Sequence, residues 1–578
     1  MKRQWKSRYY GLNERLFTLI IATLIGILAG YGAVFFRLVI KLAQFLFYQN
    51  SSDILQFHHN LNPLVIILMP SVGGLLVGII IYMGAREAKG HGVPEVMEAV
   101  ALRDGFIRKR VAAVKVMASA ICIGSGGSVG REGPIVQIGS SLASTITQII
   151  RIPRIHHRTM VGCGAAAGIA ATFNAPIAGV LFALEVLLGD FGVASFSPVV
   201  LSSVTATIIS RHYFGDFPSF LIPKYSINSL WEFGIYPFLG LMAGIVAIIF
   251  IWSLYRIEDL FDSLPIWDWI KPAIGGFILG IILLKWPHVF GVGYGAINEA
   301  LHNSLLGPFL AFLIILKIFA TSITLGSGGS GGIFAPSLFM GAMAGGFFGW
   351  MSNLLFPGIP SDPGAYALVG MGAVVAGTTH APITAIIIIF ELSGNYKIIL
   401  PLMITCILST VVSMSIKRGS IYTIKLLRRG VDIAGGLEQN ILRSLKVRDF
   451  MKDQFSAVPE SMKLLDLLSA FKKMDAPYLH VLNKKGELSG IISFRDIRTL
   501  LQEEELHHLI VAKDVASTDL LTITPEDNLL DALHKISRKG ISQLPVVEVS
   551  NSKKLIGTLR HKDILSAYDN IIQKREKS

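Results

Sequence analysis

Long apolar tracts are the feature of this sequence that most constrains its fold. About 20 consecutive apolar residues let a helix span a bilayer, and six tracts approach or exceed that length: residues 16–36, 64–83, 233–251, 308–325, 365–390 and 400–416. Only 16% of the 578 residues are charged, whereas soluble domains carry about a quarter. The chain is therefore predicted to cross a membrane many times. Several tracts contain Gly or Pro, so we expect interrupted helices.

The charges outside these tracts indicate a membrane topology. The N-terminal stretch MKRQWKSRYYGLNER and the connections at 103–110 and 151–158 are basic, and basic connections tend to face the cytoplasm. We therefore interpret the net charge of +13 as topology and expect no nucleic-acid partner. The first tract is too long for the apolar region of a cleaved signal peptide. The three cysteines lack metal-ligand spacing and predict neither a metal site nor disulfides.

A glycine-rich stretch occurs twice at an offset of 202 residues. GSGGSVGREGP (124–134) and GSGGSGGIFAP (326–336) are identical at seven of eleven positions. The second copy satisfies G-x-G-x-x-G, but no Asp or Glu lies between Gly332 and Ser361 to hold a ribose, and neither copy ends as a P-loop does. The glycines instead predict that backbone N–H groups at helix N-termini approach a bare anion, as broken helices do in transporters.

The repeat extends beyond the glycines. Lys115 matches Lys317 and Gly139 matches Gly341 at the same offset, and NAPIAGVLFALE (174–185) is echoed by HAPITAIIIIFE (380–391). In each of these helices a Glu follows the Pro by nine residues. The two halves predict a duplicated, transporter-like membrane domain, and the residues alone leave open whether the halves are inverted.

Three short stretches carry a family resemblance. GHGVPEV (90–96), GREGP (130–134) and GIFAP (332–336) resemble the signature stretches of the CLC family of chloride channels and proton/chloride exchangers. FNAPIAGVLFALE, ELSGNYKIILP and the late Ile421-Tyr422 extend the resemblance over nearly the whole of residues 1–440. It implies an all-α polytopic domain of broken, tilted helices in an inverted repeat. It also implies a homodimer in the plasma membrane with one anion pathway per subunit and both termini in the cytoplasm.

The resemblance assigns roles to individual residues. Glu132 would be the gate, a carboxylate that competes with the anion and leaves when it is protonated or displaced; the alternative from the residues alone is a structural ion pair with Arg131. An acid deep in an apolar protein is costly and suggests function. The anion-binding residues that the family implies are His91, Gly130, Arg131, Ile333, Phe334 and Tyr422. Without the resemblance, Tyr422 beside basic residues is typical of an interfacial anchor.

Two positions depart from the family pattern. His91 stands where the family usually has a Ser that binds the anion, so an imidazole N–H would replace the hydroxyl and anion selectivity becomes uncertain. Val186 stands where many exchangers have a second acid that relays protons, next to Glu185. Valine cannot carry a proton, which favours passive chloride conduction over the alternative, a proton-coupled chloride antiporter.

From about residue 441 to 578 the chain has the charge density of a soluble protein and contains a second repeat. Each copy is expected to form a strand, a turn at Pro459 or Pro525, an amphipathic helix, two strands and a helix. The repeat resembles a cytoplasmic α/β pair of CBS domains, at about 445–505 and 510–570. Such a pair also raises the different hypothesis of a membrane-tethered nucleotide sensor.

The CBS resemblance implies a weak adenine-nucleotide site. Asp496 and Asp563 stand where the family often binds a ribose, and Ser493 stands where it holds phosphate or ribose oxygens, but Arg560 occupies that place in the second copy. The alternative is that both Asp residues cap the helices that follow them. No catalytic Ser/His/Asp or metal cluster is found, so we expect a non-enzyme that requires no cofactor for transport.

Overall fold

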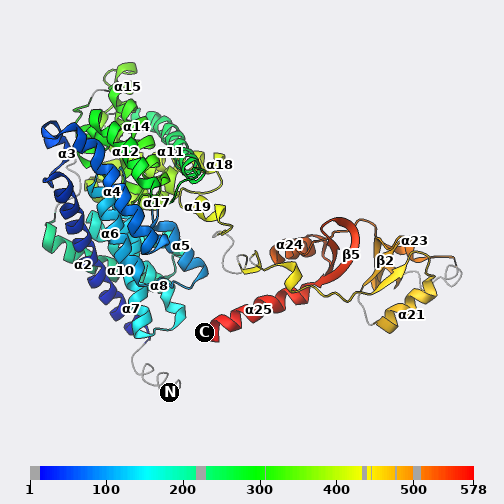
Figure 1. Cartoon of the computed structure of the whole chain (residues 1–578). Helices are drawn as coiled ribbons and strands as arrows, with labels where there is room; N and C mark the ends of the chain where they lie inside the picture. Colours follow the sequence, from blue (N-terminus) through cyan, green and yellow to red (C-terminus); the bar gives the residue numbers. More distant parts are fainter. Residues whose placement is uncertain are drawn as a thin grey trace. The chain divides into compact units, whose positions relative to one another are not determined.

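The structure, a computed structural model, describes residues 14–216, 229–305, 307–432, 439, 441–443, 445–474, 478–498 and 509–577. It divides into two units, Met1–Val431 and Asp432–Ser578, and Figure 1 shows that the first is a bundle of helices and the second contains strands with flanking helices. Each unit is described by itself.

The helices of the N-terminal unit recur in two halves. The first half contains α2 (Glu14–Tyr48), α3 (Ile54–Phe57), η1 (His58–Asn60), α4 (Pro63–Met83), η2 (Arg86–Ala88), α5 (Val93–Leu102), α6 (Arg110–Gly124), α7 (Glu132–Ile150), α8 (Arg154–Phe173), α9 (Pro176–Phe182), the π-helical η3 (Ala183–Leu188) and α10 (Val193–Phe214). The second half contains α11 (Glu232–Asp262), α12 (Lys271–Lys285), η4 (Pro287–Val289), α13 (Tyr294–Leu301), α14 (Gly307–Gly326), α15 (Phe334–Leu355), α16 (Pro363–Thr379), α17 (Pro382–Ser393), η5 (Tyr396–Ile398), α18 (Ile399–Ile416) and α19 (Thr423–Arg428). The short helices α5 and α9 thus have short counterparts in α13 and α17.

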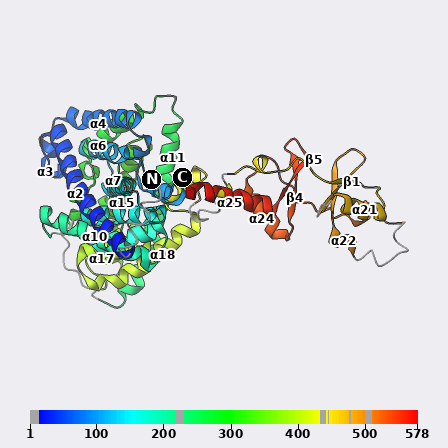
Figure 2. The same ribbon diagram turned by 90° about the horizontal axis from the view of Figure 1, so that it is seen from below.

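The two halves contain matching pairs of closely packed helices. In the first half α7 packs on α8 with Gly139 against the carbonyl of Gly164, and in the second half α15 packs on α16 with Gly341 against the carbonyl of Gly370. A Cβ at any of these glycines would overlap the facing backbone. Small residues let helices approach closely where burial of apolar surface gives no driving force. Figure 2 shows the same bundle from below, with α2 beside α10.

Seven described helices are long and apolar enough to span a bilayer, so the unit is a multi-pass membrane domain: Leu16–Tyr48, Pro63–Met83, Val193–Phe214, Glu232–Asp262, Gly307–Gly326, Phe334–Leu355 and Tyr396–Ile416. Five of the six predicted tracts coincide with these spans. Apolar runs alone missed two of the spans. Val193–Phe214 is rich in Ser and Thr, yet hydroxyls such as those of Thr205 and Thr207 donate to carbonyls one turn back, at 2.7 and 2.9 Å, so they remain satisfied in an apolar setting. Phe334–Leu355 is interrupted by glycines.

The sixth predicted tract, 365–390, is two helices. α16 ends where His380 adopts the left-handed conformation, with φ 56°, and α17 begins after it at Pro382. The same break occurs between α8 and α9 at Asn174, with φ 59°. The residue before Ala-Pro therefore ends a helix in both halves, which confirms the expectation of broken helices.

The C-terminal unit contains the expected CBS repeat. Its elements are η6 (Val447–Asp449), β1 (Ala457–Pro459), α21 (Leu464–Met474), β2 (Tyr478–Leu482), β3 (Leu488–Ser493), α22 (Phe494–Arg498), α23 (Ala512–Val515), α24 (Leu529–Lys539), β4 (Gln543–Glu548), β5 (Asn551–Arg560) and α25 (His561–Lys577). β1 pairs with β2 in parallel, while β2–β3 and β4–β5 are antiparallel. In the second copy the first strand is reduced to a bridge between Ile523 and Val546. Each copy has its own apolar core.

Candidate functional site

Three glycine-rich loops meet in the middle of the membrane unit. Gly130 and Gly332 exchange two backbone hydrogen bonds, of 2.7 and 2.6 Å. The Gly90 N–H donates to the carbonyl of Gly329 (2.9 Å), and the Gly331 N–H donates to the carbonyl of Gly90 (3.3 Å). The signature stretches from both halves are therefore joined into one loop cluster, which positions the N-termini of α7 and α15 beside each other.

Glu132 is the first residue of α7 and lies inside this cluster. Its side chain is buried, with 1% of the residue exposed, and its Oε1 accepts a 2.9 Å hydrogen bond from the hydroxyl of Tyr294. The carboxylate folds back over its own loop, because a Cβ on Gly130 would overlap Oε2. The backbone nitrogen of Ala335, in the first turn of α15, lies nearby, because a Cβ on Gly130 would meet both it and Oε2, and Oε2 has no hydrogen-bond partner among the described residues. An acid thus occupies the position where the end of a helix favours an anion.

Arg131 does not form the structural ion pair that was the alternative for Glu132. No contact within 4.0 Å joins the two charged groups, although both residues are described. The Arg131 guanidinium lies 5.3 Å from the centroid of the Tyr294 ring and donates a long hydrogen bond, 3.4 Å, to the carbonyl of Thr172.

Ile333 and Phe334 begin α15, and both side chains are buried. The Phe334 ring packs against Phe173 at a centroid distance of 5.6 Å. Their bulk turns away into the core, so the residues would contribute through their backbone N–H groups, which have no partner within a helix at its first turn.

His91 and Tyr422 form the other wall of the site. They are 3% and 1% exposed, and their rings lie 5.7 Å apart. Nδ1 of His91 has no hydrogen-bond partner among the described residues. The backbone around Tyr422 is fixed by Tyr255, whose hydroxyl donates to the carbonyl of Ile421. A buried imidazole nitrogen without a partner, beside a phenol, can bind an anion through its N–H.

A buried lysine supports one loop in each half. Lys115 Nζ donates to the carbonyls of Ala88 and Gly90, at 3.0 and 2.7 Å. Lys317 Nζ donates in the same way to Val289 and Gly291, at 3.2 and 3.1 Å. The matched lysines of the sequence repeat are therefore structural counterparts, and Lys115 holds the loop that carries His91.

The paired glutamates of the Ala-Pro repeat cap each other's helices. Glu185 accepts from the N–H groups of Ile383 (3.2 Å) and Thr384 (2.7 Å) and from the Thr384 hydroxyl (2.6 Å), all at the N-terminus of α17. Glu391 accepts from the N–H groups of Ile177 and Ala178 at the N-terminus of α9, at 3.0 and 2.7 Å. Val186 lies next to Glu185 in the π-helical segment η3.

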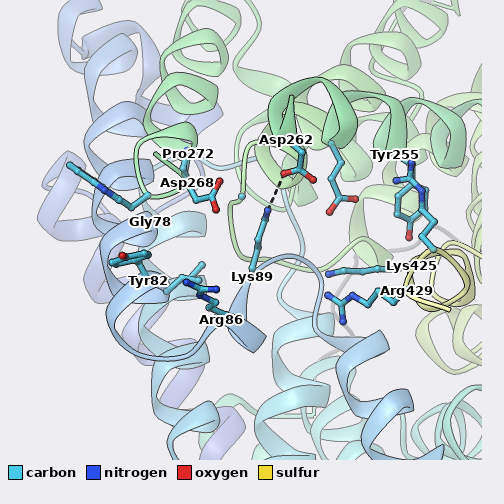
Figure 3. Close-up of a pocket in the computed structure, with 15 residues that line it drawn as sticks. Gly78, Tyr82, Arg86, Lys89, Tyr255, Asp262, Asp268, Pro272, Lys425 and Arg429 are labelled. Carbon is cyan, nitrogen blue, oxygen red and sulfur yellow. Dashed lines mark hydrogen bonds and ion pairs between the residues drawn. The ribbon is translucent and has the colours of Figure 1, made fainter. Parts of the chain in front are cut away.

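Besides a narrow pocket of about 20 Å³ that both glycine stretches line, through Gly127 and Gly329, two larger pockets are found in the described part of the membrane unit. The larger, about 560 Å³, is lined by the end of α4 and by basic side chains: Arg86, Lys89, Lys425, Arg428 and Arg429. Figure 3 shows Lys425 and Arg429 on one side of the pocket and Arg86 on the other. Lys89 lies between the two sides and pairs with Asp262. A Cβ on Gly90 would lie 3.0 Å from Lys425 Nζ, so this pocket adjoins the loop of His91.

The smaller pocket, about 150 Å³, is lined by Asp53, His288 and Tyr294 among others. The segment that carries Asp53 packs against the first half of α4, through Ile54 and Val65, so the two pockets lie toward opposite ends of α4. The residues that line this pocket include Tyr294, whose hydroxyl donates to Glu132, and those that line the larger pocket include Gly328 of the second glycine stretch.

Tyr294 is the site residue that the sequence reasoning missed. Its stretch, GVGYGAINEA (291–300), echoes GHGVPEVMEA (90–99) at an offset of 201 residues. This pair belongs to the same repeat as the glycine stretches at 124 and 326, and it matches Tyr294 with Val93.

In the C-terminal unit the two Asp residues are already engaged. The Asp496 carboxylate accepts from the backbone N–H and the hydroxyl of Ser493, at 2.8 and 2.7 Å, at the start of α22. Asp563 pairs with Arg560, whose Nε donates to it at 2.9 Å. These contacts match the alternative of helix-terminal partners, and a bound ribose would have to compete with them.

Comparisons with known proteins follow the same division of the chain. Residues 73–414 match the voltage gated chloride channel family, and residues 447–503 and 512–570 match CBS domains. The voltage-gated ClC-type chloride channel ClcB of Citrobacter koseri is 32% identical over 408 residues, which cover 70% of this chain and 97% of that protein.

Two solved structures are similar to this one. A slow cyanobacterial Cl−/H+ antiporter is 28% identical with a TM-score of 0.65, covering 72% of this chain and 98% of the antiporter chain. A eukaryotic CLC transporter, 20% identical with a TM-score of 0.64, covers 95% of this chain and 98% of its own, and it shows likeness of fold. The chain therefore belongs to the voltage gated chloride channel (CLC) family, with a pair of CBS domains at its C-terminus.

Proposed function

We propose that this chain conducts chloride passively across the membrane, through a pathway that Glu132 gates. One observation carries the proposal: the buried Glu132 carboxylate lies beside the backbone nitrogen of Ala335 at the N-terminus of α15, and its Oε2 has no hydrogen-bond partner among the described residues. A chloride ion in that place would find the same N–H groups. A carboxylate in that place competes with the anion and leaves when it is neutralised. Ile333, Phe334, His91 and Tyr422 would hold the ion, and Gly130 and Arg131 would shape the loop beside it.

The choice of a channel over an antiporter rests on the helix that follows Ala175. Val186 has no proton to give, and the neighbouring acid, Glu185, is committed to three donors at the N-terminus of α17. A proton from the pocket of Lys425 would therefore find no free acid on this helix. The antiporter is the second candidate, because the similar cyanobacterial protein is one.

The pocket of Lys425 would act as an anion vestibule. Its five basic side chains outnumber the acids Glu258, Asp262 and Asp268, and a positive vestibule with low-dielectric walls raises the local concentration of anions. By the topology argued from basic connections, this vestibule would face the cytoplasm, with both termini on the same side of the plasma membrane and the protein a homodimer.

Purified protein in liposomes tests the channel directly. A chloride gradient is imposed, and chloride and internal pH are followed together. The channel predicts chloride flux without uphill proton movement, and Glu132→Gln should keep chloride flux because its side chain is neutral. Proton pumping driven by chloride in the wild type, abolished in Glu132→Gln, would establish the antiporter instead.

The CBS pair is proposed as a regulatory unit that binds an adenine nucleotide. Ser493 and Asp496 support this through their places in the CBS repeat. Their side chains hydrogen-bond to each other, so a nucleotide would have to replace that bond. ATP, ADP and AMP should shift the thermal stability or the flux of the full chain, and the absence of any shift with all three would argue for a purely structural pair.

A further inference from the structure

Glu132 accepts a side-chain hydrogen bond from a residue outside the signature stretches. Tyr294 is the first residue of α13, and its hydroxyl donates to Oε1 of Glu132 at 2.9 Å. The first half of the repeat has Val93 at the same place, the first residue of α5, and valine has no donor. The duplicated loops therefore differ in one respect: only one carries a phenol that reaches the gate.

We propose that Tyr294 is a positioning residue that latches the Glu132 gate shut. This role rests on the proposed function of Glu132 as the gate. It adds that a hydrogen bond from Tyr294 stabilises the closed position, in which the Glu132 carboxylate occupies the proposed anion site. Hydrogen bonds to a charged acceptor are roughly twice as strong as neutral ones, so an ionised Glu132 gains most from the phenol. Departure of the carboxylate from the anion position must break this bond.

The surroundings hold the phenol in place for this task. The Arg131 guanidinium lies 5.3 Å from the centroid of the Tyr294 ring, and the α13 loop behind it is fixed by Lys317, which donates to the carbonyl of Gly291 at 3.1 Å. Tyr294 also lines the smaller pocket. Its hydroxyl therefore lies between a cavity that water can enter and a carboxylate that is 1% exposed.

Other groups act on the same carboxylate and set its pH response together with the latch. The titratable and charged side chains around Glu132 are Arg131 on its own loop, Tyr294 on α13, Lys317 on α14 and Tyr422 before α19, and Arg37 on α2 acts on Tyr294. Tyr294 can be altered without changing any charge in this set.

The test compares two variants that release the carboxylate from opposite sides. Tyr294→Phe removes the donor. Gly130→Ala adds a Cβ that overlaps Oε2 of Glu132, the far end of a flexible side chain. Both should raise chloride flux into liposomes at neutral pH, Tyr294→Phe on the order of tenfold, which is the worth of a hydrogen bond to a charged group. In Tyr294→Phe the flux should also reach half its maximum at a higher pH, because an unlatched carboxylate accepts a proton more readily.

Two controls separate the latch from the proposed gate itself. In a Glu132→Ala background Tyr294→Phe should change nothing, because no carboxylate is left to hold. Tyr48→Phe removes a similar buried phenol, which donates to the carbonyl of Ser125 at 2.8 Å and not to Glu132, and it should leave the pH profile unchanged.

The outcomes distinguish the two ideas. If Glu132→Ala raises flux while Tyr294→Phe and Gly130→Ala match the wild type in rate and pH profile, the latch is refuted and the gate stands. If Glu132→Ala itself leaves flux unchanged, the gate fails, and the latch fails with it. A rise that Tyr294→Phe still produces in the Glu132→Ala background would also refute the latch, because the phenol would then act elsewhere.

Discussion

Removal of Glu185 should destabilise the membrane unit more than removal of its counterpart in the other half. Glu185 accepts three hydrogen bonds at the N-terminus of α17, of 3.2, 2.7 and 2.6 Å, whereas Glu391 accepts two at the N-terminus of α9. Each carboxylate also lies at the positive end of a helix dipole. Truncation to Ala leaves these donors without a partner.

The magnitude follows from the number of donors. A hydrogen bond to a charged group contributes about 1.5–3 kcal/mol. Glu185 is partly exposed, so water can replace part of the loss, and about 2–4 kcal/mol is expected for Glu185→Ala against about 1–3 kcal/mol for Glu391→Ala. Glu185→Gln keeps one acceptor oxygen, but its NH₂ group cannot accept from the N–H groups at the helix terminus. Its stability should therefore lie between those of Glu185→Ala and the wild type.

Thermal unfolding in detergent, followed by intrinsic tryptophan fluorescence, gives the unfolding midpoints of the wild type and the three variants. The expected order of midpoints is wild type, Glu391→Ala, then Glu185→Ala, with Glu185→Gln above Glu185→Ala. Chloride flux per folded protein and proton coupling should be the same in Glu185→Gln as in the wild type. A Glu185→Gln variant with wild-type stability and altered proton movement would refute the reasoning, because Glu185 would then be a proton carrier and not a cap.

Three further predictions concern the loops and the CBS unit. Lys115→Met removes two bonds to the loop of His91 and should weaken chloride binding measured by calorimetry by about tenfold; an equal loss in Lys317→Met would contradict a specific role of this loop. His91→Ser should lower the ratio of nitrate to chloride flux, by about tenfold or less, and an unchanged ratio would remove His91 from the selectivity argument. Burial lowers the pKa of His480 below its ordinary value, so the folded CBS unit favours the neutral imidazole and should lose stability as the pH falls below about 6.5. The protection factors of the β2 amides in the full chain, which correct for the slower intrinsic exchange at low pH, should fall accordingly in the wild type but not in His480→Asn. Equal pH dependence in both would exclude His480 as the cause.

Much of the fold could be predicted because its constraints are local in the sequence. Apolar length located five of the seven spans, and the Ala-Pro step located the breaks after Asn174 and His380. The strands and helices of the CBS repeat could be predicted from the spacing of apolar residues and from the turn residues Pro459 and Pro525. The missed spans, Val193–Phe214 and Phe334–Leu355, have in common that their polar or small residues are satisfied or packed within the helix, which a count of apolar residues does not detect.

The candidate site was only partly predictable, because it is assembled from contacts between the halves. The glycine stretches indicated anion binding, but nothing local in the sequence says that Gly130 pairs with Gly332 or that Glu185 reaches α17. Tyr294 was hidden for the same reason: a tyrosine in a short helix has no meaning until the fold brings it to Glu132. The roles of Glu132, His91 and Tyr422 stay predictions.

The two halves agree where residues support the loops and helix ends, and they differ in the loops where the anion site is proposed. The loop lysines Lys115 and Lys317 make matching contacts in both halves, and each helix-capping glutamate accepts two backbone N–H groups at the N-terminus of a helix in the other half. In the central loops the matched positions diverge: Glu132 corresponds to Phe334, and Val93 corresponds to Tyr294. A symmetric cradle would bind an anion equally from either half and would have no gate. An acid in one half and its phenol donor in the other make the loop cluster asymmetric, so the gate proposed at Glu132 would depend on residues from both halves.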